Sequence, residues 1–597
     1  MCLIYKSDIT YVRKSAAFRL IFINKKMFLK KPVHLSLLIF GSCLLFAQLY
    51  SGHIHPYRSF YHEWAVTIGV FIALIPYFVI AKEKIIVPTI ALLVFSLIVW
   101  LSLQSLSGIT RPSAIYYPIF VLFTMILAMG LGASWVKQTG SAASLSWMFA
   151  LVFFVAALLS VLMQQVQILG LDWRPFVMYM NNDGVNPIRA FANVAQPNQL
   201  ALLICFGIAS LWWLLQNSRM PAWLGWCLAV VFLWGLSLTQ SRIAWIILPV
   251  LTALIFLAWR NSHKTSLFGL LSLLLIYVML LISLPTIAKW LGFVVGTLGE
   301  RVGGRSERTV LLQQAWAMAS AHPWFGVGWF NFGPEQVALA SNFSASIYAE
   351  HSHNIILNFA AELGIAFTIF FFVVLLSFLW KTCASKRSLE DKSVVFLLML
   401  LLAVGVHSLV EFPLWYAYVL MPVGVMLGAL HQLRWQHANL SFARPIAWAT
   451  VPICFSLLVW AWIDFHRVVD GFVAFRQEKN YALIPEDKIR APSSTLLPDF
   501  YDYFKLMRMT PVSGLSAHEM KFVETTSRRF GFVHILSKQA ETYVLNGQIE
   551  AAKKTMLSLQ RLHPWSYPEY YDYWKQLAET DTRFSEVFVE MPARDAQ

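Results

Sequence analysis

Long apolar segments alternate with short polar ones over the first 464 residues of the chain. An apolar run of roughly 17–25 residues is long enough to cross a bilayer as a helix. About thirteen such runs are expected to span a membrane, at approximately residues 34–51, 64–81, 85–103, 115–136, 144–166, 198–216, 222–240, 243–260, 266–287, 353–380, 393–410, 413–431 and 446–464. Beyond residue 465 the pattern becomes that of an ordinary helical globular chain. We therefore expect an all-α polytopic membrane protein with a membrane domain over 34–464 and a small helical domain over 465–597.

Composition agrees with this pattern. Hydrophobic residues make up 58% of the chain and charged residues only 13%, which excludes a soluble domain of this size. Four of the six cysteines lie in predicted spans and two on the expected cytoplasmic side, so no disulfide framework is expected. The four in spans are Cys43, Cys205, Cys227 and Cys454, and the other two are Cys2 and Cys383.

Lysine and arginine set the expected orientation, because short cytoplasmic loops retain positive charge. Alternate threading of the spans gathers one set of basic residues on a single side: Lys25, Lys26, Lys30, Lys31, Lys82, Lys84, Lys137, Arg219, Arg260, Lys264, Lys381, Lys386, Arg387, Lys392, Arg434 and Arg444. That side is the cytoplasm, and residues 1–33 belong to it, with translation starting at Met1 or at Met27. An odd number of spans then puts the 465–597 domain in the periplasm of a bacterial inner membrane. The net charge of +15 is thus a topology signal, and no nucleic acid is expected as a partner.

The loops on the expected outer side carry arginine where the cytoplasmic loops also use lysine. The planar guanidinium suits multidentate binding of phosphate. Each arginine taken alone is better explained by a lipid headgroup or a structural ion pair, whereas several arginines on one face favour an anion-binding site. The arginines are Arg58, Arg111, Arg174, Arg189, Arg242, Arg301, Arg305 and Arg308.

Two short outer segments are rich in amides. In "RAFANVAQPNQLA" (189–201), Asn198 is placed to cap the helix that follows Pro197, while Gln196 remains to bond other groups. In "LTQSRIAW" (238–245), Gln240 and Arg242 occupy a tight turn without an acidic neighbour in sequence. A snorkelling interfacial arginine is the alternative for Arg242.

The longest outer loop covers about 288–352 and contains "GGRSERTVLLQQAWAMASAHPWFGVGWFNFG". An amphipathic helix is predicted at about 306–320, since apolar residues recur there at helical spacing. These residues are Val310, Leu311, Ala315 and Met318. A loop of this length in a compact protein is usually functional.

The stretch "EHSHNIILNFAAELGI" (350–365) leads from that loop into a span. His351, Asn354, Asn358 and Glu362 fall on one helical face, and lipid would not tolerate such a polar stripe. It is therefore expected to line a cavity enclosed by protein. His353 joins this face only if the helix begins at Asn354, so residue spacing leaves open which histidine is central.

The segment "HSLVEFPLWYAYVLMPVGVMLG" (407–428) links the next two spans. His407 precedes Glu411 by one helical turn, so the two side chains are expected to be able to pair. A buried structural pair is the alternative to a role in a site.

These motifs together resemble the bacterial PglL-type protein O-oligosaccharyltransferases, in the superfamily that includes O-antigen ligases and O-antigen polymerases. The resemblance covers roughly residues 35–430 and rests on "EHSHNIILNFAAELG", "RAFANVAQPNQLA", "LTQSRIAW", "SERTVLLQQAW…HPWFGVGWFNF" and "EFPLWYAYVLMPVGVMLG". The "QPNQ" and "EFPLWY" segments favour the protein-glycosylating branch.

The resemblance implies a GT-C-like membrane glycosyltransferase without cofactor or metal. It would move a preassembled oligosaccharide from undecaprenyl diphosphate to Ser or Thr of an exported protein such as a type IV pilin. His353 takes the place of the essential histidine, and Arg242 and Arg308 match arginines that hold the diphosphate, with Arg305 beside them. Chemically, His353 is a candidate base, with Glu362 or Glu411 as its orienting carboxylate. Further site candidates are His351, Asn354, Gln196, Asn198, Gln240 and Arg189.

In the C-terminal domain, "SKQAETYVLNGQIEAAKKTMLSLQRLHP" (537–564) has the residue spacing of one tetratricopeptide-like unit. One unit cannot bury its own face, so it must pack on neighbouring helices or on the membrane domain. Presentation of the acceptor protein and a purely packing role are equally compatible with the sequence.

Two other functions fit parts of the sequence. A lipopolysaccharide O-antigen ligase or an O-antigen polymerase shares the membrane domain and differs in its acceptor. A transporter also has many spans, but its sites lie near the membrane midplane, whereas the polar motifs here lie at the outer ends of the predicted spans.

Overall fold

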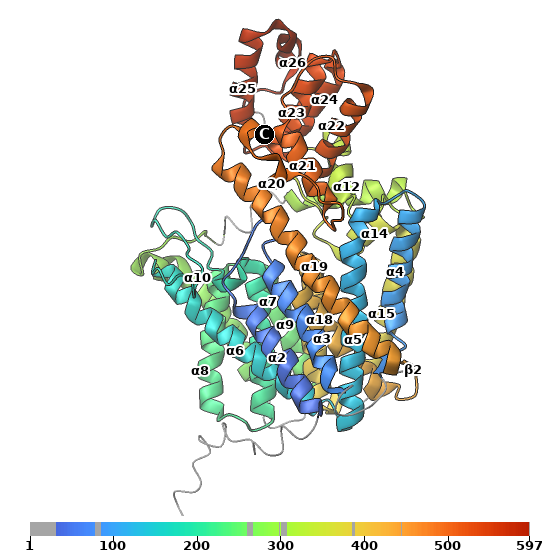
Figure 1. Ribbon diagram of the computed structural model, residues 1–597. Coiled ribbons are helices and arrows are strands. Elements are labelled where there is room, and N and C mark those ends of the chain that lie inside the picture. Colours follow the sequence, from blue (N-terminus) through green and yellow to red (C-terminus); the bar gives the residue numbers. More distant parts are fainter. Residues whose placement is uncertain are drawn as a thin grey trace, which may run out of the picture.

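The computed structural model describes residues 32–77, 85–259, 267–297, 299, 307–384, 389–442 and 444–595. A bundle of long helices carries a smaller helical domain at one end (Figure 1). We call that end of the bundle the domain-bearing end. The bundle helices are α2 (Pro32–Leu49), α3 (Phe60–Pro76), α4 (Ala91–Leu106), α5 (Pro112–Thr139), α6 (Ala143–Ile168), α7 (Pro197–Gln216), α8 (Ala222–Thr239), α9 (Ile243–Trp259), α10 (Leu267–Trp290), α15 (Ile365–Cys383), α17 (Lys392–Ser408), α18 (Ala417–Arg434) and α19 (Arg444–Gln477).

Within the described ranges, 8 helices are long and apolar enough to cross a membrane. Four shorter apolar helices lie among them, at Phe60–Pro76, Ala91–Leu106, Ile243–Leu257 and Lys392–Ser408. This agrees with the expected all-α polytopic fold, while the count of thirteen spans stays a prediction. A short antiparallel ribbon was not expected: β1 (Ile85–Pro88) pairs with β2 (Asn439–Phe442), with Ile86 opposite Ser441.

Helices α5 and α18 pack backbone against backbone at the centre of the bundle. A Cβ atom on Gly132 would lie 2.0 Å from the carbonyl oxygen of Val425, and one on Gly428 would lie 1.9 Å from that of Met129. Only glycine fits at such contacts, which let two helices approach closely in a membrane. Glu411 lies in the turn that precedes α18.

The apolar run expected to form one helix over 353–380 is instead two, α14 (Ile355–Leu363) and α15. Gly364 lies between them with φ +89°, and a Cβ there would lie 2.4 Å from the backbone oxygen of Trp324. The expectation of a continuous helix was wrong because "HPWFGVGW" packs into the break, where the Ile365 amide donates to Pro323 O at 2.7 Å.

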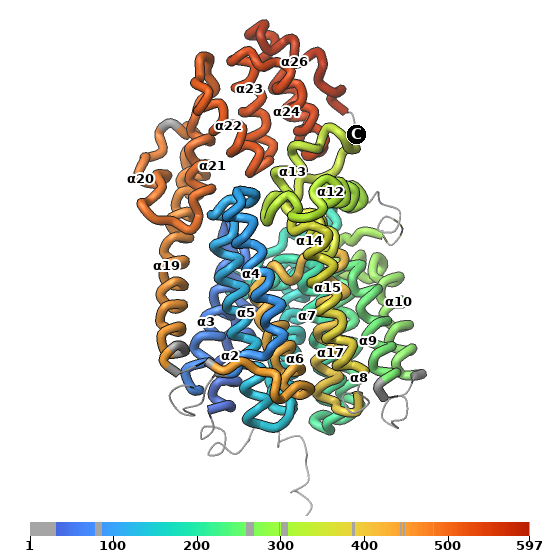
Figure 2. Tube along the Cα trace, turned by 90° about the vertical axis from the view of Figure 1, so that its right-hand side faces the viewer, coloured from blue at the N-terminus to red at the C-terminus, as the bar shows by residue number. Residues whose placement is uncertain are grey.

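The long loop folds into a layer between the bundle and the small domain (Figure 2). It contains α12 (Glu307–Ala321) and α13 (Phe332–Leu339). The expected amphipathic helix is confirmed as α12, whose apolar face is buried: Val310, Leu311, Ala315 and Met318.

Helix α19 continues past the expected domain boundary at 465 and ends at Gln477, so the bundle and the small domain share one helix (Figure 1). The small domain then contains α20 (Glu486–Ile489), α21 (Pro498–Arg508), α22 (Ala517–Phe530), α23 (Val533–Leu545), α24 (Ile549–Leu562), α25 (Tyr567–Thr580) and α26 (Ser585–Glu590). Helices α23 and α24 form a helical hairpin where the tetratricopeptide-like unit was predicted, and they share a core with α25 and α26. Short 3₁₀ turns are η4 (Ala192–Val194), η5 (Ala340–Asn342), η6 (Pro413–Trp415), η7 (Tyr481–Leu483) and η8 (Thr582–Phe584).

Candidate functional site

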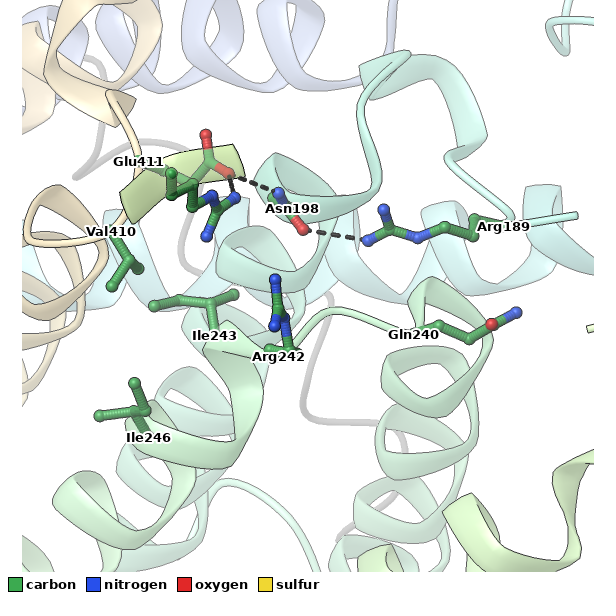
Figure 3. A pocket seen from close by; sticks show the side chains of 9 residues that line it. Arg189, Asn198, Gln240, Arg242, Ile243, Ile246, Val410 and Glu411 are labelled. Atoms are coloured by element: carbon green, nitrogen blue, oxygen red, sulfur yellow. Dashed lines mark hydrogen bonds and ion pairs between the residues drawn. The ribbon is translucent and has the colours of Figure 1, made fainter. Parts of the chain in front are cut away.

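A pocket of about 320 Å³ opens at the domain-bearing end, where α7, α9 and α12 begin and α8 and α17 end. Three arginines face one carboxylate in it, which leaves a formal charge of +2 among its charged lining residues. Figure 3 shows Glu411, Asn198 and Arg189 in a row, with the Arg242 side chain pointing toward Asn198. The lining residues are Arg189, Asn198, Gln240, Arg242, Ile243, Ile246, Arg308, Val410 and Glu411.

Glu411 is bonded to three different segments of the chain. Its Oε1 accepts from an Arg308 NH2 group and, at 2.8 Å, from Asn198 Nδ2. Its Oε2 lies 3.0 Å from His353 Nδ1. The carboxylate is only 3% exposed, and a buried charge needs such partners. Burial tends to raise the pKa of Glu411, but the His353 hydrogen bond and the Arg308 charge outweigh it, so this pKa lies below its ordinary value.

His353 lies in a tight turn directly before α14. Its φ of +57° is in the left-handed region, which costs free energy for a residue other than glycine and is common at functional sites. The next residue, Asn354, caps α14 by accepting from the Ile356 and Leu357 amides. The helix therefore begins after His353, which lets the imidazole reach Glu411.

His351, the other candidate, packs beside this pair without bonding the carboxylate. Its ring centroid lies 3.7 Å from that of Phe412 and 4.7 Å from that of His353. Burial, together with the nearby His353, lowers the pKa of His351 to about 3. His351 is therefore neutral at physiological pH and supports the wall of the site.

Asn198 was expected to cap α7, and that expectation was wrong. Gln196 occupies the N-cap position, without a side-chain bond to the helix. The Asn198 amide instead joins the pocket: besides Glu411, it bonds Ser241 Oγ at 2.8 Å and an Arg189 NH2 group at 3.1 Å through its Oδ1. Proline at the first position already starts the helix, which frees the amide for this contact.

Five of the eight predicted arginines separate into two groups. Arg189, Arg242 and Arg308 meet in the pocket. Arg111 pairs with Asp499 at 3.2 Å, and Arg174 pairs with Asp172 at 2.6 Å. Arg301 and Arg305 lie outside the described residues.

The two candidate carboxylates are also separated. Glu362 accepts from the backbone amide of Phe332 at 3.1 Å and from Asn358 Nδ2 at 3.1 Å, so it holds the long loop against α14. Glu411 alone of the two bonds His353. The polar stripe predicted on α14 is therefore divided between two contacts. Its Glu362 end faces the long loop, and its His351 end faces the site.

Three further expectations concern side-chain partners. His407 was expected to be able to pair with Glu411, but both of its ring nitrogens are buried without a hydrogen-bond partner in the described part of the chain. Gln240 turns away and donates to Ile188 O at 2.8 Å. The Gln196 side-chain oxygen is buried and lacks a partner in the described ranges.

Ser241 was not predicted as a site residue, although it sits in the quoted "TQSR" turn. A small hydroxyl between Gln240 and Arg242 was the signal that could have found it.

As for metals, no group of three or more His, Cys, Asp or Glu among the described residues is placed to hold an ion, and the metal-independent reaction stays a prediction.

Comparison with known proteins gives matches that together cover most of the chain. The O-antigen ligase family matches residues 227–372, and the C-terminal part of the virulence factor membrane-bound polymerase family matches residues 395–581. The chain is 24% identical over 554 residues to the general O-oligosaccharyltransferase of Acinetobacter baylyi, covering 89% of this chain and 93% of that protein.

A second relative from the same organism is the ComP-specific O-oligosaccharyltransferase. It is 25% identical over 287 residues, which is 48% of this chain and 50% of that protein. The O-antigen ligase match contains Arg242, Arg308 and His353, while Glu411 falls in the polymerase match. The chain is thus similar to PglL-type O-oligosaccharyltransferases over most of its length, and residues 227–372 within it match the O-antigen ligase family.

Proposed function

We propose that this protein transfers an oligosaccharide en bloc from undecaprenyl diphosphate to a Ser or Thr hydroxyl of an exported protein, a pilin-like one in particular. The observation that carries the proposal is the junction at Glu411, where a cationic pocket and a histidine meet on one carboxylate. The names of the two Acinetobacter relatives support the same class of reaction.

The cationic pocket suits the donor's diphosphate. Its excess formal charge of +2 matches a dianionic leaving group, and arginine binds phosphate oxygens in a planar, bidentate manner. Arg308 has five N–H donors, so it can hold Glu411 and an anion together. Arg242 and Arg308 would stabilise the negative charge that develops as the sugar–diphosphate bond breaks.

His353 suits activation of the acceptor hydroxyl. When Nδ1–H donates to Glu411, Nε2 is the ring atom left to accept a proton. The acceptor oxygen then bonds the anomeric carbon as its proton passes to Nε2 and the diphosphate departs. Glu411, ionised at neutral pH, orients the imidazole and stabilises its protonated form.

The proposal includes an orientation. With the lysine-rich loops in the cytoplasm, the domain-bearing end and the 465–597 domain face the periplasm of a bacterial inner membrane. Donor and exported acceptor would both reach the site from that side.

The test is His353→Ala, assayed by the intact mass of pilin from cells that carry the variant. We expect pilin without its glycan, with normal membrane levels of the protein and normal amounts of carrier-linked glycan. His322→Ala, an exposed histidine of the same long loop, is the matched control and should leave the pilin mass unchanged. Full glycosylation by the His353 variant would remove that residue from the mechanism.

Lipopolysaccharide ligation is the second candidate, favoured by the O-antigen ligase match. It predicts that loss of the gene changes the lipopolysaccharide banding pattern and leaves the pilin mass unaltered. The same pair of measurements therefore distinguishes the two acceptors.

A further inference from the structure

The C-terminal domain binds the chain segment that leads directly to His353. The Ser346 amide donates to Arg561 O at 2.7 Å, and the Tyr348 amide donates to Leu562 O at 3.0 Å. These two bonds pair residues 346–348 with the end of α24. The long loop is thus fixed to the domain only a few residues before the candidate site.

An ion-pair cluster, made of Arg529, Glu350, Asp499 and Arg111, extends this attachment. Arg529 NH1 lies 3.1 Å from Glu350 Oε1, and Arg529 Nε lies 3.3 Å from Asp499 Oδ2. Asp499 also pairs with Arg111 of the bundle. The Arg529 side chain is only 14% exposed, so its charge pairs are less screened than surface pairs.

Tyr348 packs closely beside this cluster. Its hydroxyl donates to the backbone oxygen of Arg529 at 3.4 Å, and a Cβ on Gly531 would lie 2.3 Å from its ring. Gly531 has φ +50°, so glycine serves both the turn after α22 and the contact with Tyr348.

The other side of the 351–353 turn is fixed by the bundle. Asn354 caps α14 and donates from Nδ2 to Leu409 O at 2.9 Å. Between Glu350 and Asn354 only three residues remain, and one of them is His353 in its left-handed conformation. A costly conformation persists when its surroundings determine it from both sides.

We propose that Arg529 is a positioning residue for His353, acting through Glu350. The C-terminal domain then has a role beyond capping or acceptor binding, because it supplies one of the two anchors of the turn. This inference rests on the proposed function for its kinetic consequence, but its structural consequence is independent of the reaction.

The experiment compares Arg529→Gln and Glu350→Gln with Arg528→Gln. Arg528, the neighbouring residue on α22, pairs with Glu335 on α13 at 2.6 Å. Its substitution therefore removes a similar ion pair between the domain and the long loop, but one remote from the turn. Glu350→Gln leaves the Arg529–Asp499 pair intact, so it tests the turn without disturbing the domain. Arg529→Lys keeps the positive charge, so it should retain part of the slow exchange and part of the transfer activity that Arg529→Gln loses.

Two readouts are needed. Hydrogen–deuterium exchange of the peptide covering 346–358, in detergent-purified full-length protein, should be faster in Arg529→Gln and Glu350→Gln and unchanged in Arg528→Gln. In glycan transfer, kcat should fall about 10–10²-fold for the first two variants, with an unchanged KM for the lipid-linked donor.

Unchanged exchange at 346–358 in both variants would overturn the inference. So would a loss confined to the KM of the acceptor, which would assign the cluster to acceptor binding. If the exchange results hold while wild-type protein transfers no glycan, the proposed function fails and the anchoring by Arg529 stands.

Discussion

At the scale of residues, Glu411 connects the two halves of the candidate site. It is nearly fully buried, and a buried carboxylate is tolerated only with charged and hydrogen-bonding partners. Those partners are Arg308, Asn198 and His353, from three separate parts of the chain. Any change in the charge of Glu411 therefore alters the electrostatic environment of both the anion pocket and the histidine.

Glu411→Gln should lower kcat of glycan transfer by about 10²-fold or more, because a neutral amide lacks the negative charge that stabilises a protonated imidazole. The substitution should also change how the stability of the folded protein depends on pH. The pKa of Glu411 is lowered in the folded protein from 4.5, so its contribution is fully present above pH 4.5 and is lost as pH falls through the lower value. Thermal unfolding of purified protein between pH 3 and 7 measures this, and the variant should lose that part of the acid sensitivity. Equal acid sensitivity in both proteins would contradict the assignment.

At the scale of elements, the break between α14 and α15 determines where the site lies. Residues 323–328 of the long loop pack into it: Val327 N donates to Ala361 O at 2.8 Å, and Gly328 N to Glu362 O at 3.1 Å. A continuous helix over 353–380 would exclude this segment. It would also displace Glu362, whose bond to the Phe332 amide holds the loop.

Gly364→Ala tests this element. It combines a left-handed backbone, which costs about 1–3 kcal/mol, with a collision against Trp324 O. We expect a clear fall in thermal unfolding temperature and in transfer activity. Gly140→Ala is the control: Gly140 ends α5 with φ +71°, and nothing lies within 4 Å of its Cβ position, so it should show the smaller, purely conformational loss. Equal losses would mean that the loop contact contributes nothing.

At the scale of the whole molecule, the C-terminal domain and the bundle are connected by a shared helix and by ion pairs. Helix α19 is shared between them, and the cluster around Arg529 joins both to the long loop. The residues of that cluster come from sequence positions far apart, so their proximity could not be predicted from motifs. The expected boundary at 465 marked the end of apolar composition, whereas α19 ends only at Gln477.

The proposed orientation predicts the labelling of single cysteines introduced in a cysteine-free background. Lys554→Cys, an exposed position on α24, should react with a membrane-impermeant maleimide added to spheroplasts, because the domain faces the periplasm. Gln436→Cys, an exposed position near β2 at the opposite end, should react only after the membrane is opened. The reverse pattern would invert the topology and place the site in the cytoplasm.

The sequence by itself determined the apolar helices, the amphipathic α12 and the short segments that carry the polar groups. Each of these depends on the length or periodicity of neighbouring residues, which is local information. Only the tertiary structure decided which partners those groups take. His353 and Glu411 are 58 positions apart, while Glu362, nearer in sequence, bonds the loop instead. Hydrogen-bond partners of a buried group depend on how distant elements pack, so the choice of carboxylate, the use of Asn198 and the anchoring by Arg529 came from the fold.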